Sequence, residues 1–242
     1  MEGGLEKQYA IYGTMTDCCG NLKLSSLLYF AQDTAEAHCK ELALDWDTMV
    51  QKQMFWAVIR HRVQITRLPR EGEKIRVQTW PMPTTRVAFP RSTVAYDERG
   101  RELFRAMSIW VLMDTNTRGM ILPAKSGIMV PGVTFGNELP APRSLAPQGL
   151  SSRDTRQVRF LDLDRNGHMN NTRYLDWVAD LLPSKFYGIH QPREVVICYN
   201  AEALEGQEIA MQWELNENGE LTVDGHKAEE KKERIFSAQV TF

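Results

Sequence analysis

The pattern of apolar and polar positions predicts a strand, a helix and several further strands in the first half of the chain. A strand at residues 9–16 and a bend at Gly20 precede the helix, whose apolar residues recur at helical spacing from Leu24 to Leu42. Four stretches with strand character follow, at residues 56–65, 74–80, 91–96 and 102–113. A hairpin turn at residues 97–100 joins the last two.

The second half repeats this order. A strand at residues 157–163 and a polar bend lead into a helix at residues 172–182, which Pro183 ends. Strands are expected at residues 194–202, 208–215, 220–223 and 235–242, with turns at residues 216–219 and 224–225. Because one strand, one helix and an antiparallel meander occur twice, the fold class is α+β, with helices packed on sheets in two units.

A segment rich in proline, glycine and serine separates the two units, at residues 131–153. We expect an N-terminal domain at residues 1–140, a linker at residues 141–153 and a C-terminal domain at residues 154–242.

The two halves also align as an internal repeat. An offset of 147 residues places Asp17 on Asp164 and Gly20 on Gly167 but sets Asn21 against His168. Beyond the helices, an offset of 134 residues pairs Gly72 with Gly206 and therefore Leu68 with Glu202. One copy thus keeps the turns but lacks the polar side chains, as expected for a duplicated domain with a single working site.

The polar segment at residues 162–174 is the strongest candidate for chemistry. In an extended backbone Asp164, Asn166 and His168 point the same way, and Gly167 lets the chain bend close to a ligand. Asn170 or Asn171 is expected to cap the next helix, whose positive end would stabilise a developing oxyanion.

The same segment begins like a calcium-binding EF-hand loop, with acids and amides at its opening positions. Such a loop needs a bidentate glutamate at its twelfth position, where this chain has Arg173. An arginine cannot ligate a cation, so no metal site is expected.

Composition is that of a globular protein: 242 residues, 43% hydrophobic, 25% charged, with a net charge of −2. The sequence contains no stretch of eighteen apolar residues, so no membrane span is predicted. The first residues lack the features of a signal peptide, so a cytoplasmic location is expected. The four cysteines fit no zinc spacing and are interpreted as reduced, small apolar residues.

A basic run follows the first helix, where six cations face only Glu71 and Glu73. They are Arg60, Arg62, Arg67, Arg70, Lys74 and Arg76. The run is interpreted either as a solvated strand face or as a docking patch for an acidic partner. The slightly negative net charge and the lack of an aromatic-rich recognition motif argue against nucleic acid.

Three separated segments, taken with the repeat, resemble acyl-acyl carrier protein thioesterases of the bacterial and plant type. They are residues 162–177 (DLDRNGHMNNTRYLDW), 199–206 (YNAEALEG) and 105–123 (RAMSIWVLMDTNTRGMILP). The resemblance implies two tandem hot-dog domains, in each of which an antiparallel sheet wraps around a long central helix. It also implies hydrolysis of fatty acyl-acyl carrier protein, which ends chain elongation in fatty acid biosynthesis, without a metal or organic cofactor.

The family's catalytic positions match Asp164, Asn166, His168 and Glu202. Plant members carry a cysteine after the glutamate, where this chain has Ala203, so a cysteine nucleophile is not available there. The partner implied is acyl carrier protein with a phosphopantetheine-linked acyl chain. As further substrate-binding candidates we name Asn170, Asn171, Trp56, Arg60 and Arg67, the two arginines for carrier docking.

Several alternatives stay open at this point. The enzyme would hydrolyse coenzyme A thioesters instead, or the chain would be a non-catalytic acyl-binding hot-dog protein. Either Glu202 or His168 would activate water, or a carboxylate would attack to give a mixed anhydride. Chain-length preference and the pairing of two chains into a homodimer are also open.

Overall fold

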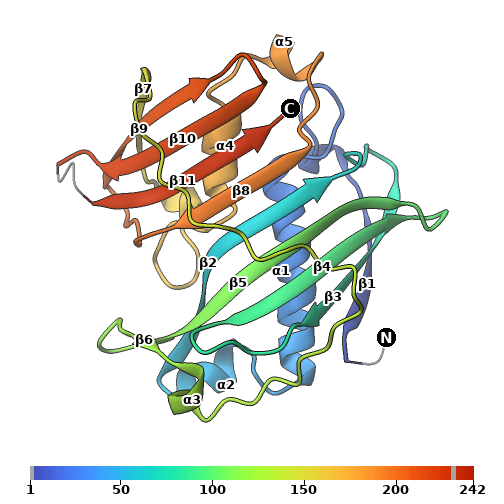
Figure 1. The fold of residues 1–242 in the computed structure, drawn as a ribbon, viewed down its shortest axis with the longest axis vertical. Helices are drawn as coiled ribbons and strands as arrows, with labels where there is room; N and C mark the ends of the chain where they lie inside the picture. The colour runs from blue at the N-terminus through green and yellow to red at the C-terminus, as the bar shows by residue number, and fades with distance from the viewer. Residues whose placement is uncertain (1–2, 230–232) are drawn as a thin grey trace.

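The computed structural model describes residues 3–229 and 233–242, and in it the strands form one antiparallel sheet (Figure 1). The order is β1-β3-β4-β5-β2-β8-β11-β10-β9-β7, with β6 paired to β5. The strands are β1 Leu5–Ala10, β2 Met54–Ile65, β3 Lys74–Pro81, β4 Phe89–Asp97, β5 Glu102–Asp114, β6 Met120–Ile121, β7 Ser152–Gln157, β8 Glu194–Tyr199, β9 Glu208–Leu215, β10 Glu220–Lys227 and β11 Arg234–Thr241.

Helices pack on one face of this sheet and the linker crosses the other (Figure 1). The helices are α1 Leu24–Glu41, α2 Trp46–Gln51, α3 Pro123–Ser126, α4 Arg173–Ala179 and α5 Ser184–Tyr187. Apolar residues of α1 and α4 share one core with both halves of the sheet. On the opposite face Leu139 and Leu145 of the linker cover apolar residues of β5 and β8.

The predicted α+β arrangement of two similar units is confirmed, but α4 is shorter than expected. It has seven residues, against eighteen in α1, and ends at Ala179 rather than at residue 182. Pro183, which lacks a backbone N–H, instead precedes α5. The two sheets are also continuous, because β2 pairs with β8.

Two predicted strands are misplaced towards the C-terminus. The strands β1 and β7 end at Ala10 and Gln157, and the following residues form 3₁₀ turns at Gly13–Met15 and Phe160–Asp162. In the second turn the carboxylate of Asp162 accepts the amide of Arg159 at 3.0 Å. Such local side-chain bonds compete with strand pairing.

The turn predicted at residues 224–225 is wrong, because both residues lie inside β10. Asp224 accepts bonds from the Arg234 guanidinium of β11 at 2.6 and 2.9 Å. A Cβ at Gly225 would lie 2.3 Å from the ring of Phe236. The glycine therefore permits close packing within the sheet rather than a turn.

The internal repeat is present in the backbone. Gly20 and Gly167 have φ of 76° and 75°. The amide of Gly72 donates to the Ile11 carbonyl at 2.9 Å, and that of Gly206 to the Val158 carbonyl at the same distance. These pairs keep the offsets of 134 and 147 residues seen in the sequence.

A buried histidine links the two halves beneath the start of α4. His61 of β2 is 1% exposed; its Nδ1 lies 2.8 Å from Oγ of Ser108, and its Nε2 lies 3.4 Å from Nδ2 of Asn171. A neutral ring satisfies both neighbours when Nδ1 donates and Nε2 accepts. Burial lowers the pKa of His61 from 6.5 to about 3, so the ring stays neutral near pH 7.

This burial predicts acid sensitivity. Between pH 6.5 and 3 His61 is protonated in the unfolded state but not in the folded state. The free energy of unfolding therefore falls as the pH drops through this range. At pH 5 the loss from this group is about 2 kcal/mol. Urea unfolding at pH 7 and pH 5 should show a decrease smaller by about that amount in His61→Gln than in the wild type. Equal decreases in both proteins would contradict the assignment.

Candidate active site

The polar segment forms a tight turn rather than the extended backbone expected from the sequence. The amide of Asp164 donates to the His168 carbonyl at 2.8 Å, and the amide of Gly167 donates to the Asp164 carbonyl at 3.0 Å. Gly167 has a positive φ, which glycine adopts without strain. The polar side chains therefore gather around a turn instead of alternating along a strand.

Asp164 organises this turn. One carboxylate oxygen, Oδ1, accepts the backbone amides of Asn166 at 2.8 Å and of His168 at 3.4 Å. The other, Oδ2, accepts the side-chain amide of Asn166 at 3.2 Å. The carboxylate thus fixes Asn166 directly, and it holds His168 through the backbone.

The structure brings His168 and Glu202 together, although 34 residues separate them in sequence. Nε2 of His168 lies 3.4 Å from Oε2 of Glu202. The Met169 amide donates to the Ala203 carbonyl at 2.8 Å, which ties the turn to the segment after β8. The side chains of His168 and Glu202 are 17% and 41% exposed, so solvent reaches this pair.

Arg118 completes this cluster from the N-terminal half, and sequence reasoning missed it. Its Nη2 lies 3.2 Å from Nδ1 and 3.0 Å from Nε2 of His168, and it forms an ion pair with Oε1 of Glu202. The guanidinium also lies over the ring of Phe55, 4.6 Å from its centroid. Arg118 lies between β5 and β6, and its membership of the segment at residues 105–123 was the only sequence signal.

The two asparagines after the turn have different partners. Oδ1 of Asn170 accepts the backbone amide and the hydroxyl of Thr172, each at 2.9 Å, but the N-cap of α4 is Thr172 itself, so the cap predicted at Asn170 is wrong. Asn171 is not the cap: its side chain faces His61, and its carbonyl accepts the hydroxyl of Tyr199 at 2.8 Å. The Thr172 amide is therefore already bonded and is not free to hold a ligand.

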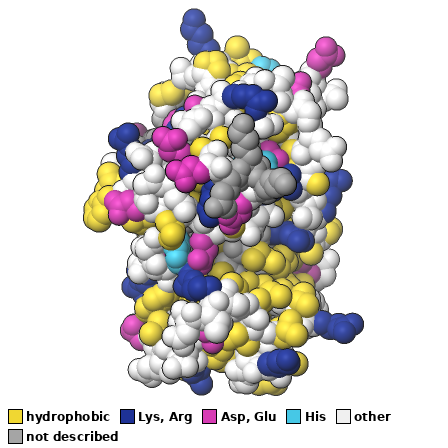
Figure 2. All heavy atoms as spheres, turned by 90° about the vertical axis from the view of Figure 1, so that its left-hand side faces the viewer, with side chains coloured by type: hydrophobic (Ala, Val, Ile, Leu, Met, Phe, Trp, Pro, Cys, Tyr) yellow, Lys and Arg dark blue, Asp and Glu magenta, His cyan; other side chains and the backbone are white. Residues whose placement is uncertain are grey.

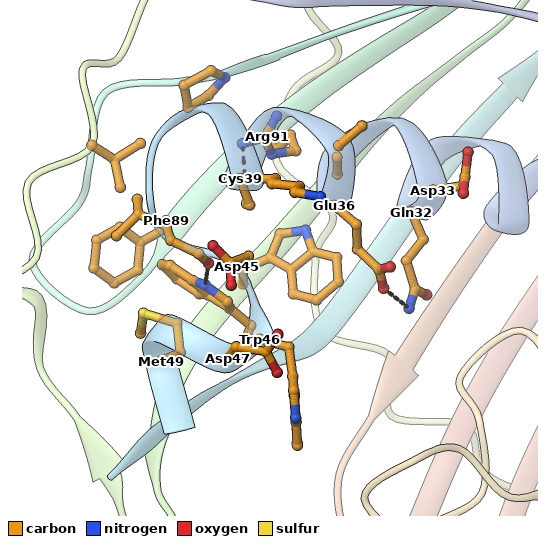
Figure 3. A pocket seen from close by; sticks show the side chains of 18 of the residues that line it. Gln32, Asp33, Glu36, Cys39, Asp45, Trp46, Asp47, Met49, Phe89 and Arg91 are labelled. Carbon is orange, nitrogen blue, oxygen red and sulfur yellow. Dashed lines mark hydrogen bonds between the residues drawn. The ribbon is translucent and has the colours of Figure 1, made fainter. Parts of the chain in front are cut away.

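A cavity of about 650 Å³ extends from this turn between α1, α2 and the N-terminal sheet (Figure 3). Asp164, Asn166 and Asn170 line it, whereas His168 and Glu202 do not. The wall on the N-terminal side includes Met49, Trp56, Phe89, Arg91 and Trp110. Trp56, a predicted substrate-binding residue, is among them, and its Nε1 donates to the Leu44 carbonyl at 3.0 Å.

Cys198 lies on the opposite face of the sheet. It is 2% exposed and packs with Leu145 and Val196 beneath the linker. The thiol therefore takes no part in the cluster around His168.

The predicted docking arginines are engaged within the chain. Arg67 forms two bonds to the Glu73 carboxylate, at 2.7 and 2.8 Å, and Arg60 donates to the Pro142 carbonyl at 3.4 Å. Arg62 and Arg76 likewise pair with Glu194 and Glu6. On the face in Figure 2, the coloured Lys and Arg side chains are scattered among acidic ones.

Among residues 3–229 and 233–242, no helix is long and apolar enough to cross a membrane.

Models of known protein families match both halves of the chain. The family model described as the N-terminal domain of acyl-ACP thioesterases matches residues 4–123, and the model of the C-terminal domain matches residues 146–242. Together they cover both halves on either side of the linker.

Curated relatives with this similarity include plant enzymes. A chloroplastic palmitoyl-acyl carrier protein thioesterase of Gossypium hirsutum is 27% identical over 194 residues, which are 74% of this chain and 47% of that protein. A chloroplastic oleoyl-acyl carrier protein thioesterase of Arabidopsis thaliana is 22% identical over 199 residues, 74% of this chain and 54% of that protein. The chain spans about half the length of the curated relatives it matches.

Solved structures share the fold over nearly the whole chain. An acyl-ACP thioesterase from Bacteroides thetaiotaomicron superposes with a TM-score of 0.86 at 24% identity and covers 100% of this chain and 98% of that one. A 12:0-ACP thioesterase from Umbellularia californica superposes with a TM-score of 0.83 at 18% identity, over 98% and 96% of the two chains. With both domain models matched in order, the chain belongs to the acyl-ACP thioesterase family.

Proposed function

We propose that the protein is a thioesterase that hydrolyses fatty acyl-acyl carrier protein to free fatty acid and carrier protein, ending chain elongation. The observation that carries the proposal is the contact between His168 and Glu202 beside the polar end of a cavity large enough for an acyl chain. The family supports the substrate class. The cytoplasmic location stays a prediction of the sequence.

In this proposal the acyl chain lies in the cavity and the thioester carbonyl lies near Asn166. The side-chain amide of Asn166, held by Asp164, would donate to the carbonyl oxygen. His168 or Glu202 would then remove a proton from the attacking water. Both Glu202 oxygens already have partners, Arg118 and His168, which favours activation of water over direct attack by the carboxylate.

Arg118 would contribute charge rather than proton transfer. Its guanidinium lies within 3.2 Å of the His168 ring, and in this proposal the departing thiolate would develop its negative charge on that side. A positive group fixed there stabilises the transition state more than the ground state.

Two other functions are less well supported. A coenzyme A thioesterase would use the same cluster, so only the carrier thiol distinguishes it. A non-catalytic acyl-binding protein needs the cavity but not the contact between His168 and Glu202. Carrier docking at Arg60 and Arg67 stays a proposal, although the internal partners of Arg67 offset its charge.

A prediction about catalysis concerns His168. His168→Ala should lower kcat for acyl-carrier protein by about two to four orders of magnitude, since general acid–base groups contribute that much. The measurement is single-substrate hydrolysis over a panel of chain lengths, each chain offered on carrier protein and on coenzyme A. His190→Ala, an exposed histidine stacked on Phe186, is the matched control and should retain wild-type rates. Full activity in His168→Ala would refute the proposed centre, and equal turnover on coenzyme A would remove the carrier assignment.

The second prediction concerns Arg118. Arg118→Met should lower kcat by about two orders of magnitude, with a smaller change in KM, because a donor to the transition state is lost. Arg118→Lys should recover part of the rate. Arg86→Met, which removes an exposed arginine between β3 and β4, serves as the control. A rise in kcat on removal of Arg118 would show instead that the arginine blocks Glu202.

A further inference from the structure

A buried arginine lines the cavity away from the catalytic cluster. Arg91 of β4 is 7% exposed and points from the sheet towards α1 (Figure 3). Its Nη1 lies 3.2 Å from Nδ1 of His38 and 3.4 Å from Oγ1 of Thr79, and its Nη2 lies 3.9 Å from Sγ of Cys39. All three partners are neutral or weak acceptors.

This guanidinium has more donors than partners. An arginine carries five N–H groups, and a buried charge is ordinarily paired with a carboxylate. No described carboxylate forms an ion pair with Arg91, unlike Arg76 on the neighbouring strand β3 and Arg62 on β2. Burial also lowers the pKa of Arg91.

A second polar group on the same cavity wall also lacks a partner. The indole Nε1 of Trp110 is buried and donates no hydrogen bond to any described residue. Apolar side chains of Met49, Trp56 and Phe89 line the same cavity, together with charged residues of α1 and α2. A plain alkyl chain would fill the space but leave both sets of donors unsatisfied.

The position of Arg91 places it beside the tail of a bound acyl chain, away from the thioester. Arg91 pairs with Ser108, and Ser108 pairs with His61, so the three lie in a row across β4, β5 and β2. Two strand spacings put Arg91 roughly 10 Å from His61, which contacts Asn171 at the start of α4. The catalytic turn lies near that end of the row, so Arg91 faces a part of the chain distant from the thioester.

The cavity wall carries charges of both signs. Glu36, Asp45 and Asp47 line it and form no ion pair with a described cation, and Lys7, Lys40 and Arg165 line it as well. A chain ending in a carboxylate would have to pass these acids, whereas a hydroxyl or keto oxygen meets no such repulsion.

We propose that the cavity takes acyl chains that carry a hydroxyl or keto oxygen on the tail, with Arg91 donating to that oxygen. The proposal rests on the thioesterase function and deepens it by naming the substrate class. If Arg91 instead forms only the floor of the cavity and limits the length of the acyl chain, oxygen-bearing substrates gain no advantage over plain ones.

The test compares chains of equal length on acyl carrier protein: octanoyl, and octanoyl bearing one hydroxyl at each position from mid-chain to the terminus. In the wild type, kcat/KM should be about tenfold or more higher for at least one hydroxylated isomer than for the plain chain, the size expected for a bond to a charged donor. Arg91→Met should lose this preference. Phe89→Leu, on the same strand and the same cavity wall, should keep it.

Three outcomes overturn the inference, and one overturns the thioesterase proposal beneath it. If the wild type hydrolyses plain and hydroxylated chains equally, or if Arg91→Met changes only chain-length preference, Arg91 is a floor and the thioesterase proposal stands. If no thioester is hydrolysed, the thioesterase proposal fails, and calorimetry with free octanoic and hydroxyoctanoic acids tests the cavity directly. Equal affinity of the wild type and Arg91→Met for the hydroxylated acid would then refute the role of Arg91.

Discussion

The pairing of β2 with β8 is the interaction on which the rest of the arrangement depends. Antiparallel bonds from Arg60 opposite Cys198 to Gln64 opposite Glu194 make one sheet out of two halves. Because β2 carries Trp56 and His61 and adjoins β5, this pairing brings the N-terminal cavity and Arg118 beside the C-terminal turn. Neither half alone contains the chain-sized cavity together with the histidine and the glutamate.

The two copies of the repeat separate what forms the backbone from what supplies chemistry. Asp17 accepts the amides of residues 19 and 21, as Asp164 accepts those of Asn166 and His168. An aspartate and a glycine are therefore enough to form the turn in both copies. In the first copy Leu68, opposite Glu202 in the alignment, is 7% exposed and belongs to the core. Three differences, Cys19 for Asn166, Asn21 for His168 and Leu68 for Glu202, thus separate a structural turn from a candidate active site on the same backbone.

Electrostatics differ between the surface of the sheet and its helix-covered face. On the surface, the basic run pairs with nearby acids, and exposed ion pairs of this kind contribute little to stability. On the covered face, His61 is neutral and Arg91 has only neutral partners. Polar groups in that low-dielectric setting interact strongly with whatever enters the cavity, so the covered face, rather than the basic run, discriminates between substrates in the proposed function.

The sequence by itself determined the repeat and the α+β fold class, because periodicity and turn residues are local properties of the chain. The family resemblance carried by the separated motifs named Asp164, Asn166, His168 and Glu202, whose catalytic roles stay a prediction. Only the tertiary structure decided what depends on contacts between distant segments. These include the ion pair between Arg118 and Glu202, the neutral partners of Arg91 and the placement of Gly225 within a strand. From the sequence alone, a glycine such as Gly225 predicts a turn, and an arginine such as Arg91 predicts a charge at the surface. Burial and the groups that pack against them settle which role each has.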